Sequence, residues 1–223
     1  MPLFNDKDWK KRNEAAEKVT EIIKAANMRI KPDGINELMD MVKQRMKDPN
    51  KAVVKAYIQL ICTLVEALGP NSRAFSKKIL PPMMENMADK STLVRADTVV
   101  GMDRWATECG AELVITLGAP MVSLDNPELR TEMLQWIIKN KDSIKLCAPD
   151  AQNAMCKPLI ECLNDKTPAI RNLADEVIVS VMPLTGYQPF QTAISSLKPA
   201  VQQSIKPIIE KIKAKVGAFA PPV

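Results

Sequence analysis

The sequence predicts an all-α fold, a paddle-like α-solenoid of about six helix pairs. Three observations support it: one turn pattern recurs about every forty residues, an amphipathic segment follows each turn, and no segment alternates in the manner of a β-strand. A fixed period in this range is typical of stacked helical repeats, in which each repeat buries its apolar face against its neighbours.

The recurring turn has an aspartate, then a helix-capping residue, then a basic residue shortly inside the next helix. The five stretches are NDKDWKKR, KDPNKAVVK, ADKSTLVR, LDNPELR and NDKTPAIR. Their aspartates are Asp6, Asp48, Asp89, Asp125 and Asp165, at steps of 42, 41, 36 and 40. Their basic markers are Arg12, Lys55, Arg95, Arg130 and Arg171, at steps of 43, 40, 35 and 41. Two independent markers therefore keep the same period.

Each turn is expected to end at a helix N-cap. The predicted caps are Asp8, Asn50, Ser91, Asn126 and Thr167, so the predicted first helical residues are Trp9, Lys51, Thr92, Pro127 and Pro168. Capping side chains accept the free amide hydrogens of the first turn, and proline at the first helical position loses no hydrogen bond. On this register arginine is the fourth helical residue in four of the five repeats.

Amphipathic segments follow the turns, and further apolar segments precede them from the second turn onward. In the second repeat the stripe includes Val54, Tyr57, Ile61 and Leu68, and the stripes of the first and fifth repeats include Ile22 and Leu184. Two helices per period describe repeats of the HEAT type. We expect one domain over 1–217, with the first helix of repeat one missing or short, a sixth pair without the turn pattern, and a C-terminal tail over 218–223.

Composition excludes several kinds of site. The 223 residues include no histidine, only seven glycines, and five cysteines without the CxxC spacing of a zinc site. Histidine-dependent hydrolases and glycine-rich phosphate loops cannot be built, so we expect no enzyme, catalytic residue, metal or cofactor, and thiols that pack as small core residues. No apolar run has the length of a membrane span, and no signal peptide begins the chain, so an intracellular protein is expected.

The turns are the candidate binding surface, because stacked helix pairs place them along one edge. Their aspartates and arginines are interpreted mainly as a structural ladder, in which each arginine reaches an aspartate of its own or a neighbouring turn. The predicted ladder residues are Asp6, Arg12, Asp48, Asp89, Arg95, Asp125, Arg130 and Asp165. The predicted binding residues are Trp9, Lys10, Lys51, Lys90, Lys166 and Arg171. For each lysine, an ordinary solvated surface position is the alternative.

Trp9 is the most informative of these residues. Other repeats place Lys, Thr or Pro at the first helical position, and a tryptophan there points away from the apolar stripe. Exposed aromatic residues of this kind often anchor protein interfaces. The alternative is packing against the first helix pair. The other tryptophans, Trp105 and Trp136, lie inside amphipathic helices and are predicted to belong to the core.

The chain also resembles a known family over nearly its whole length. The opening DWKKRNEA resembles the first turn of TOG domains, the six-HEAT-repeat tubulin-binding modules of the minispindles/ch-TOG microtubule polymerase family. The stretches ALGPNSRAFSKKIL, RADTVVGMDRWATECG, NPELRTEMLQWI and IRNLADEVI are similar to TOG domains placed late in the array. The resemblance implies that the turns bind αβ-tubulin or the microtubule plus end, with Trp9 in contact and Lys90, Lys166 and Arg171 facing an acidic surface. It also implies a cytoplasmic, cytoskeletal location at spindle and centrosome.

Rival functions follow from the same residues. A HEAT scaffold could hold a non-tubulin adaptor protein through its turns or through the basic last helix, with Lys206, Lys211, Lys213 and Lys215. Nucleic-acid binding is disfavoured because acidic residues alternate with basic ones in nearly every helix, and the net charge is only +5. We expect no membrane partner and a monomer as an isolated domain.

Overall fold

A computed structural model describes residues 2–219 of the chain. These residues form eleven α-helices and five short 3-10 helices, and the described part of the chain contains no β-strand. The all-α prediction is confirmed. The chain divides into two compact units, Met1–Val114 and Ile115–Val223. Helix α6 (Ala111–Gly118) begins in the first and ends in the second.

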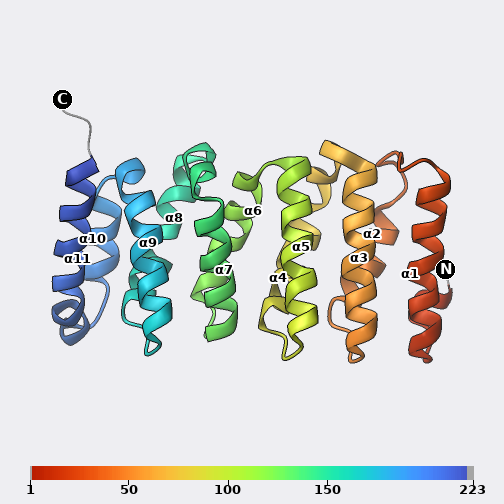
Figure 1. Ribbon diagram of the computed structural model, residues 1–223, viewed down its shortest axis with the longest axis horizontal. Helices are drawn as coiled ribbons and strands as arrows, with labels where there is room; N and C mark the ends of the chain where they lie inside the picture. Colours follow the sequence, from red (N-terminus) through yellow and green to blue (C-terminus); the bar gives the residue numbers. More distant parts are fainter. Residues whose placement is uncertain (1, 220–223) are drawn as a thin grey trace. The chain divides into compact units, whose positions relative to one another are not determined.

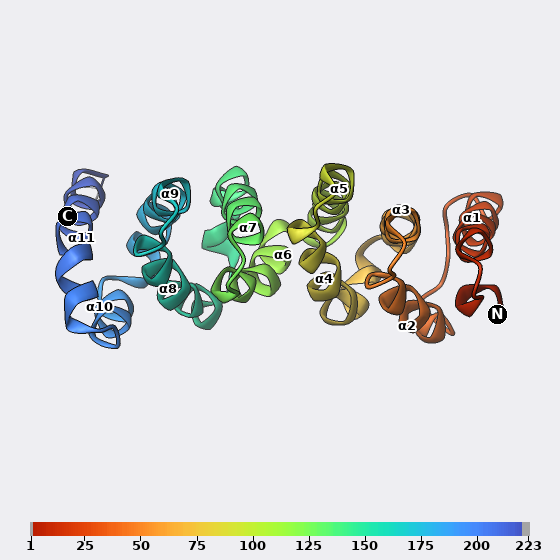
Figure 2. The same cartoon turned by 90° about the horizontal axis from the view of Figure 1, so that it is seen from below.

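The first unit consists of two layers of helices. Helices α1 (Trp9–Ala25), α3 (Lys51–Leu68) and α5 (Thr92–Cys109) lie side by side, and α3 contacts both of the others (Figure 1). Helices α2 (Asn36–Arg45) and α4 (Ser76–Met84) contact one another and form the second layer (Figure 2). The consecutive helices α2 and α3, and α4 and α5, are also in contact, so they are paired as predicted. The 3-10 helix η1 (Pro2–Asn5) precedes α1.

The second unit repeats this two-layer arrangement. Helices α7 (Pro127–Lys139), α9 (Pro168–Thr185) and α11 (Pro199–Phe219) form one layer, in which α9 contacts the other two. Helices α8 (Pro149–Leu163) and α10 (Gln188–Ser195) form the other layer (Figure 2). Helices α10 and α11 are the predicted sixth pair. Helix α11 ends two residues beyond the predicted end of the domain, and residues 220–223 of the predicted tail lie outside the described residues.

All five predicted N-caps are confirmed. Helices α1, α3, α5, α7 and α9 begin at the expected residues. The side chains of Asp8, Asn50 and Asn126 accept a first-turn N–H from Lys10, Ala52 and Leu129. Ser91 and Thr167 occupy the cap position without such a bond. The sequence therefore sets the register of every helix that follows a capped turn.

Apolar stripes form the core of each unit. The stripe of α3 is buried between α1 and α5, and Trp105 and Trp136, with 0% and 2% of their surface exposed, confirm the prediction for these tryptophans. Cys109, Cys147, Cys156 and Cys162 are buried and Cys62 is half-buried, all as free thiols. Two stripe predictions are wrong: Ile22 is 68% exposed and Leu184 is 43% exposed. Both lie near helix C-termini, and the nearby Ile23 and Met182 are buried instead.

The segment Lys51–Ala88 is long and apolar enough to match a membrane span, with a mean hydropathy of 1.5 over a window of 18 residues. It comprises α3, η2 (Gly69–Phe75), α4 and η3 (Glu85–Ala88) rather than one uninterrupted helix. The apolar side chains of α3 are packed against α1 and α5. Burial in the helical core therefore accounts for this hydropathy.

Candidate functional site: the capped turns

In four of the five capped turns, the aspartate of the turn accepts a backbone hydrogen bond that holds the turn in place. The Oδ1 atoms of Asp6, Asp48, Asp89 and Asp165 accept the N–H of the residue two positions later at 2.8 to 2.9 Å. The acceptor in each case precedes the N-cap, so the carboxylate fixes the backbone just before the helix begins. Asp125 is different, because it lies only one residue before its cap and its side chain is fully exposed.

The arginine at the fourth helical position closes the same turn from the other side. Arg12 Nη1 donates to the carbonyl oxygens of Asp6 at 2.7 Å and Lys7 at 3.1 Å. Arg95 makes the same contacts with Asp89 and Lys90 at 2.8 and 3.4 Å. Arg171 repeats them with Asp165 and Lys166 at 2.7 and 3.2 Å. The turn backbone is thus rigid before any partner binds.

In the first unit, two ion pairs link successive turns. Arg12 Nε and Nη2 donate to Asp48 Oδ2 and Oδ1 at 2.9 and 3.0 Å, a bidentate and almost fully buried pair. The Lys51 ammonium lies 2.6 Å from Asp89 Oδ2, and only 6% of the Asp89 side chain is exposed. Each pair joins a cation of one turn to the aspartate of the following turn.

Asp48 is the most constrained carboxylate of the first unit. Besides Arg12, it accepts a hydrogen bond from Arg45 Nη1 at 3.0 Å. Burial acts to raise the pKa of Asp48, but the hydrogen bonds from Arg12 and the Asn50 N–H, with the charges of Arg12 and Arg45, outweigh it and hold the pKa below its usual value of 3.8. Asp48 is therefore ionised at neutral pH.

Tyr57 supports the first turn from the core. Its hydroxyl donates to the carbonyl oxygen of Arg12 at 3.0 Å, and its ring meets Phe4 edge-on with centroids 5.8 Å apart. Burial raises the pKa of Tyr57 to about 12, so the hydroxyl keeps its proton and remains a donor. The start of α1 is therefore fixed by Asp48 and Tyr57 together.

In the second unit, Arg130 provides the corresponding link. Its Nη1 donates to Asp165 Oδ2 at 2.6 Å and its Nε to the carbonyl oxygen of Val122 at 3.1 Å, whereas Asp125 Oδ1 lies at 4.0 Å. Burial acts to raise the pKa of Asp165, but the hydrogen bonds from the Thr167 N–H and Arg130 hold it below its usual value. Arg171 contacts only its own turn, and within the described residues no carboxylate pairs with it.

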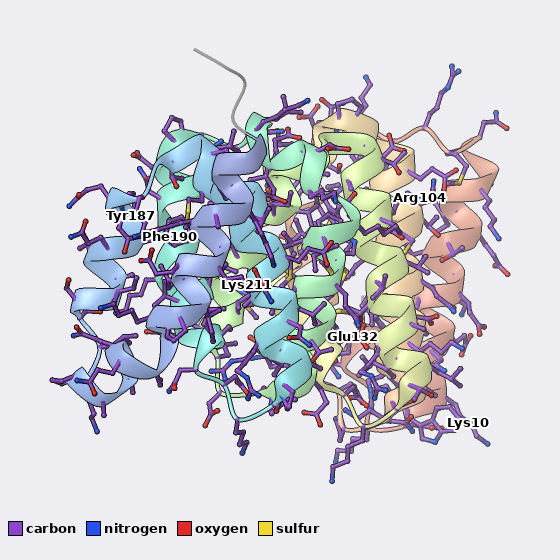
Figure 3. All side chains as sticks on the ribbon, turned by 60° about the vertical axis from the view of Figure 1, so that its left-hand side comes forward. Lys10, Arg104, Glu132, Tyr187, Phe190 and Lys211 are labelled. Carbon is purple, nitrogen blue, oxygen red and sulfur yellow. The ribbon has the colours of Figure 1, made fainter. Side chains whose placement is uncertain are left out.

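The remaining predicted binding residues lie at the tips of the turns. Trp9 is 40% exposed although it begins a helix whose cap and fourth residue are both fixed. Lys10, Lys90 and Lys166 are exposed, and Lys10 extends from the start of α1 into solvent (Figure 3). None of these three lysines pairs with a carboxylate among the described residues. The first unit thus presents Trp9, Lys10 and Lys90, and the second unit presents Lys166 and Arg171.

Lys51 has a structural role that the sequence reasoning missed. In the second repeat the fourth helical residue is Val54, which is fully buried and cannot pair with Asp89. Lys51, at the first helical position, supplies the cation instead. The sequence carried a signal for this role: Val54 stands where the other repeats have arginine, so Asp89 of the following turn needs a cation from another position. Arg45, which also binds Asp48, carries no repeat marker.

The turns have the features of a binding surface. The carboxylates of Asp6, Asp48, Asp89 and Asp165 are engaged by arginines, lysines and backbone amides. The described residues contain no group of three or more metal-ligating side chains. Rigid turns with an exposed aromatic residue, and cations that no described carboxylate pairs with, are features that suit protein binding. The fold and the turns therefore define a helical-repeat interaction module.

Comparison with known proteins identifies the module's family. The chain belongs to the XMAP215/Dis1/CLASP, TOG domain family, whose profile matches residues 3–207. It is 29% identical over 223 residues to Centrosomal protein 224 of Dictyostelium discoideum, covering 98% of this chain and 11% of that protein. It is 24% identical over 218 residues to Protein mini spindles of Drosophila melanogaster, covering 94% of this chain and 10% of that protein. The chain thus spans about a tenth of the length of these relatives.

Solved structures confirm the predicted HEAT-repeat solenoid. Drosophila melanogaster Mini spindles TOG3 superposes with a TM-score of 0.62 at 19% identity, covering 99% of this chain and 94% of that one. A structure from work on TOG-tubulin binding specificity in microtubule dynamics and mitotic spindle formation superposes with a TM-score of 0.66 at 15% identity, covering 96% of this chain and 79% of that one.

Proposed function

We propose that this chain is a tubulin-binding module of a microtubule-associated protein. Its capped turns dock αβ-tubulin and promote microtubule growth and spindle assembly. Membership of the TOG domain family supports the partner, since solved relatives of the same fold concern tubulin recruitment by microtubule polymerases and TOG-tubulin binding specificity. The names of the relatives, Centrosomal protein 224 and mini spindles, support a cytoskeletal location at centrosome and spindle.

The observation that carries the proposal is the placement of Trp9. The N-cap, the Arg12 guanidinium and the Tyr57 hydroxyl all fix the backbone beside it, yet 40% of the indole is exposed. A large aromatic side chain on a rigid backbone loses little conformational entropy on binding. Trp9 therefore serves as the apolar anchor of the first turn.

The cations around the turns orient the partner. Lys10 and Lys90 in the first unit, with Lys166 and Arg171 in the second, face acidic groups of tubulin and accelerate its association. Lys51 contributes less to binding, because its ammonium is already paired with Asp89. Asp6, Arg12, Asp48, Asp89, Arg95, Arg130 and Asp165 hold the turns in place. Asp125, exposed at its turn, contributes least to that framework.

The protein acts by binding and not by catalysis. The chain functions as one domain over 1–217, corresponds to a late position in an array of such domains, and is a monomer in isolation. It requires no nucleic acid, membrane or cofactor.

Size-exclusion chromatography with purified αβ-tubulin tests the proposal. The wild-type chain co-elutes with tubulin, and the complex weakens as salt is raised, because the lysine contacts are screened. Failure of the wild-type chain to shift the tubulin peak at any salt concentration would reject tubulin as the partner. Recovery of a different protein in its place would favour an adaptor scaffold.

A further inference from the structure

A basic groove lies between α2 and α4, on the layer that does not carry Trp9. It measures about 490 Å³ and is lined by Lys43, Gln44, Lys47, Lys77, Lys78, Pro81, Pro82 and Glu85. All of these residues belong to the first unit. Four of the eight lining residues are lysines and one is acidic, so the groove is far more basic than the chain as a whole.

Two of the four lysines are neutralised by carboxylates. Lys47 Nζ lies 2.8 Å from Glu85 Oε2, and Lys78 Nζ lies 2.8 Å from Asp40 Oδ1. Lys43 and Lys77 are exposed and form no ion pair with any described residue. The groove therefore keeps two uncompensated positive charges, one from the last turn of α2 and one from the first turn of α4.

The prolines of α4 contribute apolar rings to the lining of the same groove. Pro81 and Pro82 are consecutive and lie inside the helix, so neither offers an N–H group. The carbonyl groups of Lys77 and Lys78, four residues earlier, cannot receive their regular helical hydrogen bonds. The groove thus combines two free ammonium groups with the apolar rings of Pro81 and Pro82, a pairing that suits an extended peptide with acidic side chains.

We propose that the groove between α2 and α4 binds an extended acidic segment of a partner protein. The carboxylates of the segment pair with Lys43 and Lys77, and its main chain lies along the proline rings. Lys43 and Lys77 have no role in the fold that the structure shows. The groove adjoins the second capped turn at Lys47 but does not include Trp9, so its occupation does not depend on Trp9.

Fluorescence anisotropy with a labelled ten-residue peptide of alternating glutamate and alanine tests this site. The wild-type chain is expected to bind it, and the same peptide with glutamine for glutamate is expected to bind at least tenfold more weakly. The double variant Lys43→Glu/Lys77→Glu is expected to weaken glutamate-peptide binding at least tenfold. The matched control Lys141→Glu/Lys157→Glu, which changes two exposed lysines of the second unit, should change it less than twofold.

Three results would overturn the proposal. Equal affinity for the two peptides would show that charge is not recognised, and equal loss in the two double variants would show that only net charge matters. Binding to phosphatidylserine vesicles without binding to the glutamate peptide would show that the occupant is a membrane surface. The Trp9→Glu variant should bind the peptide normally, which separates this site from the proposed tubulin surface. Circular dichroism checks that each variant is folded.

Discussion

The guanidinium of Arg12 joins two turns through the carboxylate of Asp48. Its Nε and Nη2 atoms donate to Asp48 at 2.9 and 3.0 Å, while its Nη1 atom donates to the carbonyl oxygen of Asp6 at 2.7 Å. One side chain therefore closes the turn that carries Trp9 and fastens it to the following turn. The position of the exposed indole depends on this buried pair.

Removing the arginine should destabilise the fold strongly. Arg12→Ala leaves the Asp48 carboxylate buried with one fewer cation and opens the first turn, so we expect a loss of about 3 kcal/mol in the free energy of unfolding. Urea denaturation measures it. Lys18→Ala is the control, since it removes an exposed ion pair with Glu14 in the same helix and should cost less than about 0.5 kcal/mol. Equal costs for the two variants would contradict the role given to Arg12.

The ladder carboxylates should make stability depend on pH in acid. The pKa values of Asp48, Asp89 and Asp165 lie below the usual value, so the unfolded chain binds more protons than the folded chain as pH falls. Their contribution is complete above the unfolded pKa of about 4 and is lost as pH falls through the folded pKa values. The free energy of unfolding, measured in urea, should therefore decrease between pH 5 and pH 3.

Asp48→Asn provides the test of that assignment. The variant cannot titrate at residue 48, so its free energy of unfolding should be lower than that of the wild type at pH 7 and should fall less steeply in acid. A slope as steep as that of the wild type would show that other groups cause the pH dependence.

Gly110 should be difficult to replace. It ends α5 with a φ of 92°, a left-handed conformation that disfavours any residue with a Cβ atom. Gly110→Ala should reduce the free energy of unfolding by about 1 to 2 kcal/mol. Gly217→Ala is the matched control. Gly217 lies within α11 with open space around it, so alanine there should raise the free energy of unfolding by about 0.5 kcal/mol. Thermal unfolding that ranks the two variants in the opposite order would contradict this account.

Replacing Arg171 should mainly weaken tubulin binding, whereas replacing Arg130 should mainly lower the stability of the fold. Arg130 pairs with Asp165, whereas Arg171 contacts only the carbonyl groups of its own turn and keeps donors free for a partner. Arg171→Ala should weaken tubulin binding about five- to tenfold with a small loss in stability. Arg130→Ala should mainly lower the unfolding midpoint. Isothermal titration and thermal denaturation of both variants separate the two effects.

Much of the fold was predictable because its signals are local. Caps at Asp8, Asn50 and Asn126 act within three residues of themselves, so they could be located without tertiary information. The exposure of Ile22 could not be predicted, because Ile22 and Ile23 are adjacent and equally apolar, and only the packed structure shows that Ile23 is the buried one. The ion pair between Lys51 and Asp89 was also not predictable from local sequence. It depends on the burial of Val54 one helical turn after Lys51.

The candidate site was predicted less completely than the fold. An exposed Trp9 followed from its position relative to the cap, but the contacts that fix it, from Asp48 and Tyr57, lie 39 and more residues away in the chain. The basic groove was not predicted at all. Lys43 and Lys77 carry no repeat marker, and only the pairing of α2 with α4 brings their helices together.

Affinity of the Trp9→Glu variant for αβ-tubulin tests the central claim most directly. Ile22→Glu is its matched control, since it makes the same change in charge at an exposed apolar residue of the same helix, away from the capped turn. Loss of an aromatic anchor costs about 2 kcal/mol, so Trp9→Glu should weaken the complex about 30-fold and Ile22→Glu less than twofold. Equal affinity of Trp9→Glu and wild type would contradict the docking of tubulin through the first turn.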